Sequence, residues 1–444
     1  MRCSHLARRP HSVTGVAIAC LVTCICSTVS ADLAITSIDT NLTVTWTNTF
    51  TEGVISPQVT DSLLEPWEQM QNLFTSGSSG HVVFTDSVLP HFCRFVAVDL
   101  STNDPNHYTN LLNSYGLLTT IAGKGQFGAN QNNWLPEYEG APATNVNLSR
   151  PHITFADREN NLLIVDEQSG SVLKLKPDGT IHSFAGTHVN GFNGDGPAPA
   201  TSIKLDRPNG GWMGTNGIFY VLDTYNSRVR RIGSNGVMST LITTSGNFGG
   251  EGRGLWVNSA ETLAYYCAGP ALVKWTPTGG IITVRTDFVD LGNIIGDDAT
   301  GALYITDRGG HSVYHMTTSG TLTRIAGNGT TSGGGDGSLA TNTGLNSPRT
   351  LCFLPNGGYF IGEHDPGNRI WYVDPANIIH RIMVGSSNEN SVKFAGDGAW
   401  FFANPTMPKV HKVRAINMDQ FGNIILTEND LGFIRKIEFK RMNP

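Results

Sequence analysis

The chain has 444 residues, of which 39% are hydrophobic, 15% are charged and 51 are glycine, and its formal net charge is −6. A negative chain lacks the basic face that a nucleic-acid partner requires, so we expect no such partner. Many glycines and few charges are typical of short strands joined by turns, and they disfavour helical or disordered chains.

The first 31 residues have the layout of a secretory signal peptide. Arg2, Arg8 and Arg9 precede an uncharged apolar stretch over 16–26, and the small residue Ala31 offers a cleavage site. The stretch is too short to span a bilayer, and no later run reaches about 18 apolar residues. We therefore expect a secreted protein, extracellular or periplasmic, with no membrane span. Cleavage would remove three arginines and no acidic residue, which takes the formal charge from −6 to −9.

Cleavage would also leave only three of the seven cysteines, Cys93, Cys267 and Cys352. Their spacing forms neither a disulfide framework nor a CxxC metal site. We expect buried free thiols, with a single bridge of the 93–352 type as the alternative.

Residues 32–100 differ from the rest of the chain. Apolar and polar residues alternate over 33–38, 42–46 and 91–98, which is the pattern of half-buried strands. We predict a small β-sandwich-like module over 32–100, a linker over 101–115 and a second domain over 116–444.

An internal repeat dominates the second domain. Each unit holds an apolar strand, a polar turn, a second strand, an acidic turn and further strands, and the six units begin at residues 149, 206, 250, 290, 346 and 411. The turns carry Gly, Asn, Asp or Pro, as hairpins require. Four strands in about 40–65 residues predict propeller blades rather than a solenoid.

The two ends of this domain predict how the ring closes. The last unit stops after its third strand, at 434–439, while the segment 117–122 matches the fourth-strand segment 321–326. We therefore predict that 117–122 pairs with 434–439. This pairing would close a six-bladed ring and remove the open edges that a propeller must avoid.

The motifs of the units now resemble a known family. G-x-[LIF]-Y-[VI]-x-D, D-x-x-N-x-R-[IV]-[RW] and A-G-x-G followed by G-D-G-x-x-A are similar to NHL repeats, most closely over 208–232 and 301–326. The resemblance covers 116–440 and implies an all-β fold, a six-bladed propeller. It implies little about chemistry, because one fold carries many functions.

Aligning the first strand of each unit gives one register with six polar residues: His152, Asn209, Arg253, Asn293, Arg349 and Arg414. Resemblance to the peptidylglycine amidating lyase, whose zinc is held by histidines at this register, implies that the six line the mouth of the central channel. All are hydrogen-bond donors, and three guanidinium groups suit a carboxylate, sulfate or phosphate. Alternatively, each arginine pairs with an acidic residue of a neighbouring loop and merely lines a solvated channel.

The resemblance also leaves enzymatic alternatives open. A zinc lyase needs about three protein ligands, but only His152 matches, although His364 and His411 could approach. A gluconolactonase-like propeller implies a divalent ion held by carboxylate and amide groups; Asn209 and Asn293 would supply the amides, and no ring position supplies the carboxylate. We predict no cofactor and leave a single axial calcium or zinc ion open.

Other recurring residues are assigned to the fold. A catalytic group is needed once, whereas a turn is needed in every unit. We therefore assign a structural role to the acidic residues that follow the second strand in five units: Asp166, Asp223, Asp307, Glu363 and Glu428. We expect Asp223 to cap its loop or to pair with Arg228. The aspartates of three Gly-Asp-Gly turns are given the same structural role: Asp195, Asp336 and Asp397.

The long connections contain five aromatic residues: Trp134, Tyr138, Trp400, Phe401 and Phe402. They could stack on a sugar, although packing against the propeller is the simpler interpretation. No nucleophile elbow, HExxH, Walker or dinucleotide motif occurs in the sequence. We predict a secreted, non-catalytic binding scaffold whose channel face takes an anionic or carbohydrate-like ligand or a protein. The alternative is a metal-assisted lyase or lactonase at the same mouth.

Overall fold

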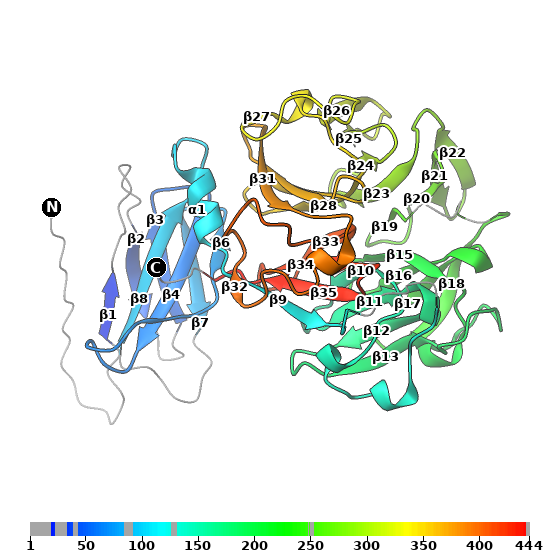
Figure 1. Cartoon of the computed structure of the whole chain (residues 1–444), viewed down its shortest axis with the longest axis horizontal. Coiled ribbons are helices and arrows are strands. Elements are labelled where there is room, and N and C mark those ends of the chain that lie inside the picture. Colours follow the sequence, from blue (N-terminus) through cyan, green and yellow to red (C-terminus); the bar gives the residue numbers. More distant parts are fainter. Residues whose placement is uncertain are drawn as a thin grey trace. The chain divides into compact units, whose positions relative to one another are not determined.

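A computed structural model describes residues 19–22, 33–38, 43–83, 92–125, 131–246, 248 and 253–440. The chain divides into two compact units, one formed by Met1–Gly116 with Glu438–Pro444 and the other by Leu117–Ile437 (Figure 1). Apart from the strand β1 (Ala19–Val22), the predicted signal peptide lies outside the described residues and stays a prediction. Within the described ranges, no helix has the length and apolar character needed to cross a membrane.

The N-terminal unit contains two sheets that share an apolar core. One sheet has the order β2 (Leu33–Ile38), β3 (Thr43–Asn48) and β7 (Ser79–Val83). The other places β8 (Phe92–Asp99) between β1 and β4 (Gly53–Thr60), with β5 (Glu68–Gln69) and β6 (Leu73–Thr75) both paired to β4. Trp46 of β3 and Phe95 of β8 meet in this core with ring centroids 5.7 Å apart.

The predicted linker 101–115 is instead part of the N-terminal unit. It contains the helix α1 (His107–Asn113), whose Leu111 and Leu112 are buried, and Asn110 Nδ2 donates to Asp99 O at 2.9 Å. Phe439 also belongs to this unit, where it is fully buried and stacks on Phe74 with ring centroids 4.2 Å apart. These apolar contacts anchor both segments in the N-terminal unit.

The cysteine prediction was right for two residues and wrong for one. Cys267 and Cys352 are free and buried, and burial raises the pKa of each thiol to about 12. Cys93 is disulfide-bonded, which corrects the expected free thiol, and a 93–352 bridge is excluded because Cys352 is free. The pairing of cysteines cannot be deduced from their spacing alone.

The described residues of the C-terminal unit form six antiparallel sheets, each named by its innermost strand. The first two sheets consist of β10 (Pro151–Ala156), β11 (Leu162–Asp166), β12 (Ser171–Leu175), β13 (Ile181–Gly186), then β15 (Pro208–Met213), β16 (Phe219–Asp223), β17 (Arg228–Ile232), β18 (Val237–Thr243) and β14 (Ala198–Pro199). The next two consist of β19 (Leu255–Val257), β20 (Ala264–Ala268), β21 (Ala271–Thr276), β22 (Gly280–Arg285), then β23 (Leu291–Gly296), β24 (Leu303–Asp307), β25 (Ser312–Met316) and β26 (Leu322–Ala326).

The remaining two sheets consist of β28 (Pro348–Phe353), β29 (Tyr359–Glu363), β30 (Arg369–Val373), β31 (Ile378–Val384), β27 (Ser338–Leu339), then β33 (Val413–Met418), β34 (Ile424–Glu428), β35 (Phe433–Ile437), β9 (Leu117–Ala122) and β32 (Ala399–Trp400). Short 3-10 helices lie in the connections: η1 (Pro136–Tyr138), η2 (Ala143–Asn145), η3 (Glu167–Ser169), η4 (Ala200–Ser202), η5 (Thr224–Asn226), η6 (Ala340–Asn342) and η7 (Glu389–Ser391).

The innermost strands form a closed ring, because each contacts the innermost strands of two neighbouring sheets, in the order β10, β15, β19, β23, β28, β33 and back to β10 (Figure 1). Apolar clusters fill the space between adjacent sheets; one of them joins Leu163 and Val165 of β11 to Phe219 and Val221 of β16. This near all-β arrangement of four- and five-stranded sheets is consistent with a β-propeller.

The predicted closing pair is present. The strand β9 pairs antiparallel with β35, with Ile434 opposite Ala122 and Ile437 opposite Leu118. The prediction extended two residues too far, because the residues after Ile437 belong to the N-terminal unit. The first strand of the C-terminal unit, β9, therefore completes the sheet formed by its last strands, β33, β34 and β35, as the sequence match predicted.

Candidate functional site

The five recurring acids hold the connections in place. In each of the five sheets, the carboxylate that ends the second strand accepts the backbone N–H of a residue one or two positions before the first strand, at 2.7–2.9 Å. The aspartates of two Gly-Asp-Gly turns bond to a strand of the same sheet rather than within their own turn: Asp195 contacts Arg228, and Asp336 accepts the backbone N–H of Arg381. The structural interpretation of both groups is confirmed.

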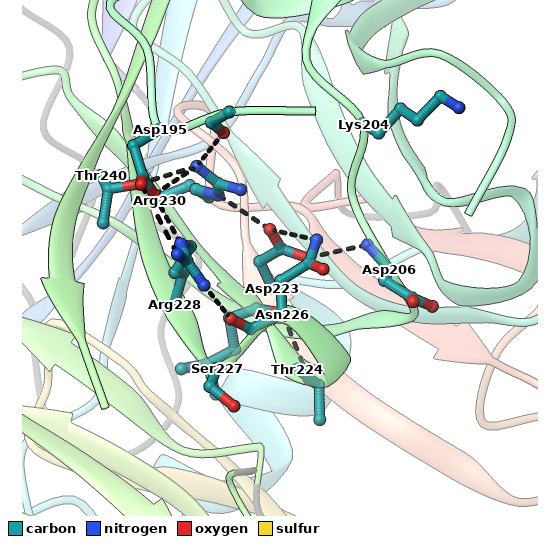
Figure 2. Close-up of polar contacts among 12 residues, drawn as sticks. Asp195, Lys204, Asp206, Asp223, Thr224, Asn226, Ser227, Arg228, Arg230 and Thr240 are labelled. Carbon is teal, nitrogen blue, oxygen red and sulfur yellow. Dashed lines mark hydrogen bonds and ion pairs between the residues drawn. The ribbon is translucent and has the colours of Figure 1, made fainter. Parts of the chain in front are cut away.

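Figure 2 shows this network in the β15 sheet, where one detail differs from the prediction. Asp223 accepts the Asp206 N–H at 2.7 Å, both Asn226 Nδ2 contacts at 2.9 Å and Arg230 Nε at 2.8 Å. Arg228, the predicted partner of Asp223, pairs with Asp195 instead, at 2.5 Å. The side chains of Asp223 and Arg230 are both completely buried, so this sheet contains a buried ion pair.

The β10 sheet lacks the corresponding arginine. Arg230 lies opposite Val221 on the second strand, and Leu173 lies opposite Ile164 at the equivalent position. Asp166 therefore has no arginine at the position that Arg230 occupies beside Asp223. Burial raises the pKa of Asp166 to about 7 from its ordinary value of 3.8, despite hydrogen bonds that lower it.

Burial is the main cause of this raised pKa, because Glu428 has its pKa raised to about 7 as well although Arg435 lies 3.5 Å from it. The raised pKa of Asp166 predicts a pH dependence of stability. Because the folded state binds the Asp166 proton more tightly than the unfolded state, the stabilising contribution is present below pH 4 and is lost as pH rises to about 7, by about 4 kcal/mol in total. We expect Asp166→Asn to melt at a higher temperature than the wild type at pH 8 and at a similar temperature at pH 4. Asp223→Asn is the control, which should be less stable at both pH values because Arg230 stays buried; parallel pH profiles for wild type and Asp166→Asn would contradict the argument.

A bulge recurs at the start of the innermost strands and positions the predicted ring. The pairing skips His152, Asn209, Arg349 and Arg414, each of which lies second in its strand, and in β23 it skips Gly292 and Asn293. A bulge frees one residue from the ladder and redirects its side chain. Five innermost strands thus have a β-bulge at the predicted register. The exception is Arg253, which lies two residues before the shorter strand β19.

Two ring residues meet a carboxylate that sequence reasoning missed. Arg253 Nε donates to His152 Nδ1 at 3.3 Å, while His152 Nε2 lies 3.2 Å from Glu167 Oε2. Burial lowers the pKa of His152 to about 3, with Arg253 and Arg414 adding to the effect and Glu167 opposing it. His152 is therefore a neutral imidazole whose Nδ1 accepts from Arg253 and whose Nε2 carries the proton toward Glu167.

Glu167 is itself held by cations. Arg150 Nη1 lies 3.1 Å from Glu167 Oε2, and Gln168 Nε2 donates to the same oxygen at 3.2 Å. Burial would raise the pKa of Glu167, but its contacts with His152 and the charges of Arg150 and Arg253 lower it below the ordinary value. Glu167 follows a recurring acid in the sequence, and nothing in the repeat marked it as special.

The three ring arginines all lower the pKa of His364, which the sequence singled out only as a zinc candidate. His364 follows β29 directly and is 9% exposed. Burial lowers its pKa far below the ordinary value, and the next four influences all come from guanidinium groups: Arg349, Arg414, Arg253 and Arg308. The surroundings of this buried histidine are therefore positively charged, and its imidazole is neutral.

The two ring asparagines are engaged locally. Asn209 Oδ1 accepts from Thr224 Oγ1 at 2.7 Å, and Asn293 Oδ1 accepts the Ile294 N–H at 2.8 Å. Among the six predicted residues, His152 and Arg253 are in direct contact, and the two asparagine oxygens accept hydrogen bonds within their own sheets. The aromatic residues of the connections pack as expected: Tyr138 and Phe401 are buried, and Trp134 stacks on His188.

The axial zinc or calcium implied by the lyase and lactonase resemblances does not fit these residues. His152 turns one ring nitrogen toward Arg253 and the other toward Glu167, so neither nitrogen offers a lone pair to an ion on the axis. The other ring positions are arginines and asparagines, and arginine is a permanent cation that binds no metal. No catalytic step is derived through such an ion.

No protein-family model and no curated protein matches the chain. Solved structures share its fold. A structural genomics protein of unknown function from Bacteroides thetaiotaomicron VPI-5482 aligns with a TM-score of 0.57 and 13% identity, over 91% of this chain and 98% of that one. Two auxiliary nutrient binding proteins, from Bacteroides ovatus ATCC 8483 and B. thetaiotaomicron VPI-5482, align with TM-scores of 0.54 and 0.52 and identities of 13% and 12%. They match 89% of this chain and 94% and 93% of their own; such identities establish likeness of fold alone.

Proposed function

We propose that this protein is an exported six-bladed NHL-type propeller that binds an anionic ligand at the mouth of its central channel and performs no chemistry on it. The closed ring of six innermost strands and the β9–β35 pairing support the blade count. The basic, apolar and small-residue segments of the first 31 residues support export.

The observation that carries this proposal is that Arg253, Arg349 and Arg414 are all buried and all act on the buried His364, whose pKa they lower. All three arginines are at most 7% exposed. Guanidinium groups suit a carboxylate, sulfate or phosphate, because such a group carries the opposite charge and accepts bidentate hydrogen bonds from them.

The alternative for the arginines is pairing with acids of neighbouring loops, and the structure shows what such pairing looks like. Arg308 pairs with Asp290, and Arg150 with Glu167. Arg253 Nε donates to the uncharged imidazole of His152. A ligand that carries an acidic group, including an acidic sugar, matches this donor set better than a neutral one does. The names of two structural neighbours, auxiliary nutrient binding proteins, are compatible with a binding role.

The proposal is tested by titrating acetate, sulfate and phosphate by calorimetry into the wild type, Arg349→Ala and Arg253→Ala. Because a hydrogen bond to a charged group contributes about 1.5–3 kcal/mol, each substitution should weaken binding by roughly ten- to a hundred-fold. Arg285→Ala is the matched control and should bind the anions as the wild type does. Arg285 is the last residue of the exposed strand β22 and pairs with Asp287. Equally weak binding by all four proteins would refute the proposal.

A further inference from the structure

A second cluster of polar side chains contains none of the six ring residues; Arg150 connects the two groups, because it lies 3.1 Å from Glu167 and 3.8 Å from Asp430. Glu389, His411 and Asp430 come from three separate segments: the start of η7, the connection before β33 and the turn between β34 and β35. One nitrogen of His411 and one oxygen of each acid all lie within 4.8 Å of one another. We propose that these three residues bind a divalent transition-metal ion, with zinc as the representative ion.

The first argument is the tautomer of His411. Its Nδ1 lies 2.7 Å from the carbonyl oxygen of Ser386. A carbonyl oxygen only accepts, so Nδ1 must carry a proton, and in a neutral imidazole Nε2 then presents its lone pair. Histidines that bind metals almost always donate their other N–H in this way, because the second hydrogen bond fixes the ring.

The second argument is where that lone pair points. His411 has a completely buried side chain, and its Nε2 makes no hydrogen bond in the described part of the chain. It lies 3.5 Å from Glu389 Oε1, which also presents only lone pairs when ionised. Two acceptors that face each other without a hydrogen repel, and a cation between them removes the repulsion.

The backbone around His411 holds this geometry. The His411 N–H donates to Glu428 Oε2 at 2.7 Å, and the Ser386 N–H donates to Val410 O at 3.1 Å. His411 is therefore fixed at both its backbone and its ring. Glu389 keeps 33% of its side chain exposed, so it can adjust to an ion without disturbing the core.

The chemistry of the donors selects the ion. Imidazole nitrogen suits zinc and its first-row neighbours, whereas magnesium and calcium prefer oxygen ligands throughout. Three protein ligands leave a coordination position for water or another ligand. Two carboxylates supply the negative charge that a divalent ion needs.

Lys412 and Arg150 compete with an ion for Asp430. Lys412 Nζ lies 2.6 Å from Asp430 Oδ2, and Arg150 Nε lies 3.8 Å from Asp430 Oδ1, which also accepts from Asn429 Nδ2 at 2.7 Å. A carboxylate has about four lone-pair positions, so Asp430 keeps room for an ion. The ammonium group of Lys412 nevertheless weakens the attraction of Asp430 for a metal ion. Removing this lysine should therefore strengthen metal binding.

The experiment uses the full chain, stripped with a chelator and titrated with Zn²⁺ alone by calorimetry. We expect one equivalent to bind, a higher melting temperature, and no displacement by excess Mg²⁺. Glu389→Gln should bind at least several-fold more weakly and His411→Gln should lose the equivalent, whereas Lys412→Met should bind more tightly. His380→Gln is the matched control, because His380 also contacts an acid, Asp374 at 3.1 Å, outside the cluster.

Three results would overturn the proposal: no uptake by the wild type, equal uptake by Glu389→Gln, or weaker uptake by Lys412→Met. The Glu389 variant keeps the test valid if His411→Gln fails to fold, since Glu389 is partly exposed. Zinc binding by the ring variants Arg349→Ala and Arg253→Ala should equal that of the wild type. The metal site and the proposed anion site can therefore fail separately.

Discussion

Arg230→Leu should lower the free energy of unfolding by about 3–5 kcal/mol, because removing one partner of a buried ion pair leaves the other charge buried alone. Arg230 and Asp223 both have completely buried side chains and lie 2.8 Å apart. Denaturant unfolding, followed by the ellipticity of the sheets, measures the loss. Arg228→Leu is the control, because its partner Asp195 is 51% exposed, and exposed pairs contribute about 0–1 kcal/mol.

A double substitution sharpens this prediction. The β10 sheet already combines Leu173 with a buried aspartate, so Arg230→Leu with Asp223→Asn should recover most of the lost stability. Equal losses for the Arg228 and Arg230 variants would show that burial of the pair does not determine its contribution.

Ending the chain after Gly432 should abolish cooperative unfolding of the C-terminal unit. This deletion removes β35, the strand that joins β9 to β34, and so breaks the sheet that closes the ring. Ending the chain after Ile437 should preserve that transition, because the complete β9–β35 pairing remains. Both deletions remove Phe439, so the shorter one should destabilise only the N-terminal unit, where large-to-small changes of this kind in a core cost about 3–5 kcal/mol.

Thermal melting and limited proteolysis of the two truncated proteins separate these effects. Proteolysis should attack the C-terminal unit only in the longer deletion. If both deletions abolish the transition of the C-terminal unit, the residues after Ile437 contribute to ring closure in a way that the strand pairing does not explain.

The repeat explains how much of the fold could be predicted. Six copies of one pattern give the strand order, and the match between 117–122 and a fourth strand gives the closing pair. The helix α1 was missed because its anchors, Leu111 and Leu112, occur in a short polar segment without helical periodicity. The disulfide of Cys93 was missed because spacing carries no information about pairing.

The candidate sites show the same division. The register of the ring was predictable because bulged residues recur at the second position of successive innermost strands. Glu167 and His364 each occur in a single unit, so an alignment of the six units does not single them out. The contacts of His411 depend on the path of a long connection, which no local pattern encodes.

The division of the chain has a consequence for biosynthesis. The chain leaves the N-terminal unit at Gly116 and returns to it at Glu438, and the Gly116 N–H donates to Glu438 O at 2.7 Å. Domains usually mature in the order in which a ribosome delivers them. In this protein the N-terminal unit is synthesised first, but its buried residue Phe439 is synthesised only after the strands of the C-terminal unit. The N-terminal unit should therefore complete its core last.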